Sequence, residues 1–96
     1  MTVKAFKDSL RQAAPPDGLS PLLQALWYEG KGDWHTAHNI AQDVPGPDGS
    51  WVHAYLHRVE GDDWNANYWY RRAGRSMPGH SLKEEWPVLV AHFLGQ

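Results

Sequence analysis

Apolar side chains recur every three or four residues along most of the chain, which is the spacing of one face of an α-helix. The expected helices cover residues 2–14, 20–30, 34–44, 50–61, 64–73 and 81–94. No segment alternates apolar and polar residues as a half-buried β-strand does. We therefore expect an all-α protein.

Residues that favour helix ends stand at the edges of these segments. The predicted N-caps are Thr2, Ser20 before Pro21, Asp33, Ser50, and Ser81 in a capping box with Glu84. Residues 45–49 (Pro-Gly-Pro-Asp-Gly) are the most turn-rich stretch, so we expect a loop there and a helix that begins after it. Pro87 predicts either a kink in the last helix or a short first turn followed by a separate helix.

Part of the pattern occurs twice. Gly32, Asp33 and Ala37 recur 29 residues later as Gly61, Asp62 and Ala66, and the preceding helices end in Glu29-Gly30 and Glu60-Gly61. This repetition predicts a helix–turn–helix pair that is used twice.

The second copy resembles the tetratricopeptide (TPR) family and its Sel1-like relatives. The residues that carry the resemblance are Gly61, Ala66, Tyr70, Ala73 and Pro78, and the likeness covers residues 20–78. It implies two antiparallel helical hairpins, with the first and last helices covering the ends of the stack. In addition, the string from Trp51 to Arg75 is similar to a small bacterial family of undefined function.

Composition narrows the range of functions. The chain has 96 residues and no cysteine, so we expect one domain, residues 1–96, without disulfides, thiol chemistry or cysteine-bound zinc. A net charge of −2 argues against a general nucleic-acid binder. No apolar run is long enough for a membrane span and no secretory signal is visible, so we expect a cytoplasmic protein.

The TPR-like resemblance implies a concave face that binds a protein or peptide, or a second copy of the chain. The predicted partner-binding residues are His38, Gln42, His53, His57, Arg58, Asn67, Trp69, Tyr70 and Arg71. We found no serine nucleophile elbow and no phosphate-binding loop. We therefore predict an interaction module without a cofactor or catalytic residues, rather than an enzyme.

Histidine spacing supports a different function. His53 and His57 are four residues apart and share a helical face, as in helical zinc motifs, although Ala54 stands where those motifs carry glutamate. His35 and His38 lie on the preceding helix, which should run antiparallel, so either could approach His57. The alternative is therefore a metal-binding protein or enzyme that uses His35, His38, His53 and His57. Otherwise these side chains are solvated or cap helix ends.

Arg71, Arg72 and Arg75 form a local basic group, with His80 nearby in the sequence. Arginine binds phosphate and carboxylate through paired hydrogen bonds, so this group is a candidate anion site. The other interpretation is that these cations offset the helix dipole and pair with the nearby carboxylates of Glu60, Asp62 and Asp63.

Six tryptophans are many for a chain of this length. We expect Trp27, Trp51, Trp69 and Trp86 to lie in the core, because they fall on or beside apolar stripes. Trp34 and Trp64 begin two helices, where they either cover the loops or are exposed at a binding groove. The adjacent Glu84 and Glu85 are expected to face solvent.

Overall fold

The computed structural model describes all residues from 1 to 96, and its regular structure is entirely helical. The elements are α1 (Val3–Asp8), the 3₁₀-helix η1 (Ser9–Arg11), α2 (Pro21–Gly30), α3 (Trp34–Gln42), α4 (Gly46–Val59), α5 (Asp63–Arg72) and α6 (Leu82–Leu94). The all-α prediction is confirmed. None of these helices combines the length and apolar character needed to cross a lipid bilayer.

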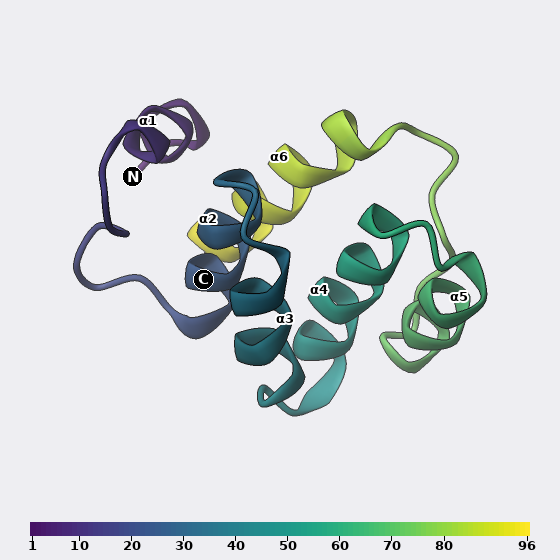
Figure 1. Cartoon of the computed structure of the whole chain (residues 1–96). Helices are drawn as coiled ribbons and strands as arrows, with labels where there is room; N and C mark the ends of the chain where they lie inside the picture. Colours follow the sequence, from purple (N-terminus) through teal and green to yellow (C-terminus); the bar gives the residue numbers. More distant parts are fainter.

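The four central helices pack in chain order. α2 packs against α3, α3 contacts α4, and α4 packs against α5. After a long connection from α5, α6 returns across the molecule and packs against α2, α4 and α1 (Figure 1). α1 and α5 therefore lie at opposite ends of the molecule (Figure 1).

Side chains cap five of the helices. Four of these caps (Thr2, Ser20, Asp33 and Ser81) were predicted, whereas the predicted cap Ser50 lies inside α4. Thr2, Ser20, Asp33, Asp62 and Ser81 each accept a hydrogen bond from a backbone N–H in the first turn of their helix. The capping box of Ser81 and Glu84 is complete in both directions. Each such cap satisfies a backbone group that the helix itself leaves without a partner.

The repeated Gly-Asp pair has the same backbone geometry in both copies. Gly32 and Gly61 both have φ of +85°, a region that favours glycine. The N–H groups of Asp33 and Asp62 each donate across the turn, to the carbonyls of Tyr28 and His57, at 2.9 Å in both cases. Ala37 and Ala66, which follow, are both completely buried. The sequence repeat is thus also a repeat of local structure.

The N-terminal helix is shorter than predicted. Its α-helical part ends at Asp8, and Ala13 and Ala14 are exposed and outside any helix. The hydroxyl of Ser9 donates to the carbonyl of Phe6 and accepts from the indole N–H of Trp27 at 3.1 Å. Ser9 is therefore held by tertiary contacts, and Ala13 and Ala14 beyond it remain exposed.

The turn-rich stretch was predicted wrongly as a loop, because α4 begins at Gly46 rather than after Ser50. Pro47 lies in the first turn, where a missing N–H costs no helical hydrogen bond. Gly46 begins the helix with φ of +89°. At the other end of the chain, α6 runs unbroken through Pro87, so of the two alternatives for this proline the separate first turn is wrong.

One cluster of 19 buried apolar residues forms the core. Trp27, Trp51 and Trp86 belong to it, as predicted, whereas Trp69 is only half-buried at its edge. Trp34 is half-buried, and Trp64 is 78% exposed on α5.

Candidate metal site

Three histidines meet where α3 packs against α4. His38 comes from α3, and His53 and His57 lie one turn apart on α4. One nitrogen from each ring lies within 4.8 Å of the other two, and the Nε2 atoms of His38 and His53 are 3.1 Å apart. His35, the other candidate on α3, is exposed and lies outside this group. We call His38, His53 and His57 the histidine cluster.

Two indole rings form the walls of the histidine cluster. Trp34 stacks on His38 with ring centroids 4.7 Å apart, and Trp69 stacks on His53 at 4.1 Å. The indole N–H of Trp34 donates to the backbone carbonyl of Leu56 on α4 at 2.7 Å. This hydrogen bond ties the start of α3 to α4 and thereby fixes the ring against which His38 packs.

A carboxylate holds the third ring. Nδ1 of His57 donates to Oε1 of Glu60 at 2.7 Å, and because a carboxylate can only accept, the proton stays on Nδ1. In the neutral form of this ring, Nε2 then carries the lone pair that could bind a metal ion. The sequence interpretation that paired Glu60 and Asp62 with the arginines is wrong, since Asp62 caps α5. The three-residue spacing of His57 and Glu60 on one helical face was the available signal.

The environment keeps two of the rings uncharged. Burial, together with the neighbouring His57 and His38, lowers the pKa of His53 to about 4. Burial also lowers the pKa of His38. Both imidazoles are therefore neutral near pH 7, which is the form that binds metal ions.

One distance in the histidine cluster already matches a metal centre. Zinc–nitrogen bonds of about 2.0–2.1 Å in a tetrahedral site place neighbouring nitrogens about 3.3 Å apart. The 3.1 Å separation of the His38 and His53 nitrogens is close to this value. Three protein ligands leave a fourth coordination position for water or another ligand.

The other predicted partner-binding residues do not share one open face. Arg58 and Tyr70 both bond to Glu85 of α6 and are covered by that helix, and Tyr70 is 1% exposed. Gln42 is exposed and bonds to Asn39, while Asn67 is half-buried and Arg71 is exposed. Only Trp69 joins the histidines of the predicted set.

Arg71, Arg72 and Arg75 do not act as one group, because Arg72 and Arg75 contact different tryptophans. Arg72 lies 5.3 Å from the ring centroid of Trp69 and bonds to the hydroxyl of Tyr68. Arg75 instead lies over the ring of Trp51, at 3.5 Å from its centroid. The arginine group therefore does not form a single anion site.

Glu85 was missed by the sequence interpretation, which placed it in solvent. It is only 2% exposed. Its position three residues after Leu82 and four before Leu89 puts it on the apolar stripe of α6, and this spacing was the available signal.

No known protein-family model matches the chain, and no curated protein or solved structure is detectably similar to it. What the histidine cluster can do is therefore inferred from its own geometry and chemistry.

Proposed function

We propose that the protein binds one divalent transition-metal ion through His38, His53 and His57. The observation that supports this most strongly is the convergence of three imidazole nitrogens within 4.8 Å, from two helices and between two indole walls. Imidazole ligands suit zinc, copper, nickel and iron, whereas magnesium and calcium prefer oxygen ligands.

A metal ion accounts for the cluster better than packing alone. Within the cluster a hydrogen bond joins only His38 to His53, whereas Nδ1 of His57 bonds outward to Glu60. One ion would engage a nitrogen of all three rings at once. Glu60 adds the outer carboxylate that commonly orients a metal-binding histidine. A bound ion with an open position would supply Lewis-acid chemistry or an activated water.

The test is metal binding by tag-free protein. Calorimetry with zinc, supported by elemental analysis, is expected to give one equivalent per chain. The His38→Gln variant should bind more than about a hundredfold more weakly, because a direct ligand is lost and loss of an orienting group alone costs about 10–100-fold. The matched control is His35→Gln, on the same helix but outside the cluster, which should bind as the wild type does.

The Glu60→Gln variant is a second test, in which zinc affinity should fall less than in His38→Gln. The neutral amide can donate as well as accept, so it no longer forces the proton onto Nδ1 of His57, and affinity should fall about 10–100-fold while the fold is kept. Absence of zinc binding by the wild type, or equal binding by the His38 and His35 variants, would refute the proposed function.

A TPR-like interaction module is the second candidate. It is supported by the repeated turn geometry and by two exposed rings on α5, since Trp64 is 78% and Tyr68 43% exposed. These rings are nearly parallel, with centroids 6.4 Å apart. Because α6 packs against α2 and α4, we place the partner, a protein, a peptide or a second copy, on α5. Unchanged self-association and partner capture in Trp64→Ala would count against this.

A further inference from the structure

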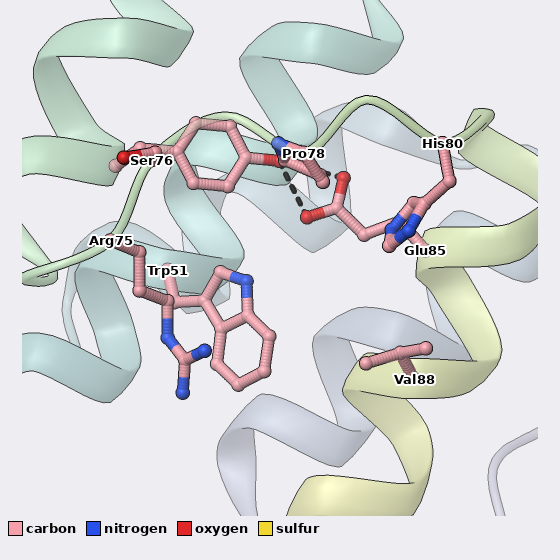
Figure 2. A pocket seen from close by; sticks show the side chains of 8 residues that line it. Trp51, Arg75, Ser76, Pro78, His80, Glu85 and Val88 are labelled. Atoms are coloured by element: carbon pink, nitrogen blue, oxygen red, sulfur yellow. Dashed lines mark hydrogen bonds between the residues drawn. The ribbon is translucent and has the colours of Figure 1, made fainter.

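A hollow of about 280 Å³ lies between α4, α5, α6 and the connection that precedes α6 (Figure 2). Its lining includes Trp51, Arg75, Ser76, Pro78, His80 and Val88. None of these residues belongs to the histidine cluster. The hollow is therefore a second place where chemistry-bearing side chains gather.

The polar groups still free at this hollow can all donate hydrogen bonds. The Arg75 guanidinium is held over the Trp51 ring at 3.5 Å and makes no hydrogen bond or ion pair within the protein. Nε2 of His80 is the one buried side-chain nitrogen or oxygen without a hydrogen-bond partner. Ser76 adds an exposed hydroxyl. A buried polar atom without a partner is costly, and the protein supplies none to His80.

The carboxylate of Glu85, which also lines the hollow, already has hydrogen-bond partners within the protein. Glu85 accepts from Nη1 of Arg58 at 2.8 Å and from the hydroxyl of Tyr70 at 2.7 and 2.6 Å. Arg58 neutralises its charge, so Arg75 remains as the uncompensated charge of the hollow. A bound molecule would therefore meet one positive charge, with the hydroxyl of Ser76 as a further hydrogen-bonding group.

We infer that this hollow binds a small organic carboxylate, with the carboxylate at Arg75 and its apolar body against Trp51, Pro78 and Val88. Arginine matches a carboxylate with two parallel hydrogen bonds. The volume is near the lower end of small-molecule sites, which limits the ligand to a few carbon atoms or one ring. Apolar walls favour such a molecule over inorganic phosphate.

Three probes of graded chemistry test the inference, in buffer with a chelator so that no metal is present. Benzoate should bind saturably and shift the NMR signal of the Trp51 indole N–H. Benzamide has the same shape without the charge, and inorganic phosphate has charge without an apolar body. Both should bind at least tenfold more weakly. Binding of benzamide or phosphate equal to that of benzoate would overturn the inference.

Single-residue variants test whether benzoate binds at this hollow. Arg75→Gln should weaken benzoate binding about 10–100-fold, the range for loss of a charged hydrogen-bond partner. Arg71→Gln, an exposed arginine outside the hollow, is the matched control and should bind normally. His57→Gln separates this site from the metal site. Benzoate binding that is lost in His57→Gln and retained in Arg75→Gln would contradict the inference and leave the metal proposal intact.

Discussion

His53 shows most clearly how single residues shape the site. Its ring lies between Trp69, at a centroid distance of 4.1 Å, and His57, at 4.8 Å, and both pairs are stacked. Only 8% of the residue is exposed. A protonated ring here would lose hydration and face His38 and His57, so the folded protein favours the neutral form.

This predicts a pH dependence of stability in the metal-free protein. The pKa of His53 is lowered from 6.5 to about 4 on folding, so between these values the unfolded chain binds more protons than the folded one. Stability should therefore be full above pH 6.5 and fall as the pH drops toward 4. We expect His53 to account for a loss of roughly 2 kcal/mol, measured by urea unfolding at a series of pH values.

The matched variant is His53→Phe, which keeps a ring against Trp69 but cannot take up a proton. Its free energy of unfolding should change less than that of the wild type across the same pH range. Identical pH profiles for the two proteins would contradict the role assigned to His53.

At this scale the sequence predicted the cluster only in part. The spacing of His53 and His57 was sufficient to place both on one face, but it left His35 and His38 as equal candidates. The choice depends on how α3 is rotated against α4, which the Trp34 hydrogen bond to Leu56 helps to fix. Contacts between helices are not encoded in the spacing within one helix.

At the scale of elements, the turn between α3 and α4 is determined by a close approach of backbone atoms. Gly49, in the first turn of α4, lies against the carbonyl of Val44, and a Cβ atom there would lie 1.9 Å from that oxygen. Proline and glycine in this stretch therefore serve the start of a helix. The pattern indicated a loop because the same residues favour turns.

Gly49→Ala should destabilise the protein by about 2 kcal/mol or more, since the added methyl group forces the Val44 backbone away. Gly79→Ala is the control, because a Cβ atom there would meet nothing within 4 Å, and it should change stability by less than about 0.5 kcal/mol. Thermal or urea unfolding of both variants measures this. Equal stability of the two variants would show that α4 does not need the close approach.

Helix ends were the most predictable elements. Ser20, Asp33 and Ser81 cap as expected, because capping depends only on residues within one turn. The early end of α1 was not predictable, since it depends on the bond between Ser9 and Trp27, 18 residues away.

At the scale of the whole molecule, one buried polar network joins α6 to α4 and α5. Glu85 of α6 bonds to Arg58 and Tyr70, and Arg58 also donates to the carbonyl of His80. The side chains of Arg58 and Glu85 are 16% and 2% exposed. These bonds link residues up to 27 positions apart, which is why the apolar pattern alone did not reveal them.

Removing one partner of this network should therefore loosen α6. Glu85→Ala leaves Arg58 and Tyr70 without their acceptor, and we expect a loss of about 3–5 kcal/mol in the free energy of unfolding. The double variant Arg58→Met with Glu85→Leu should lose much less, because no unpaired charge remains. A change in Glu85→Ala below about 0.5 kcal/mol would show that the network does not hold the helix.

The most direct measurement is a crystal structure of the zinc-loaded, tag-free protein with anomalous data at the zinc edge. We predict one anomalous peak per chain, bonded at about 2.0–2.1 Å to a nitrogen of each of His38, His53 and His57. A zinc-loaded crystal with no peak among these three rings, or with its only peak at other side chains, would contradict the proposal.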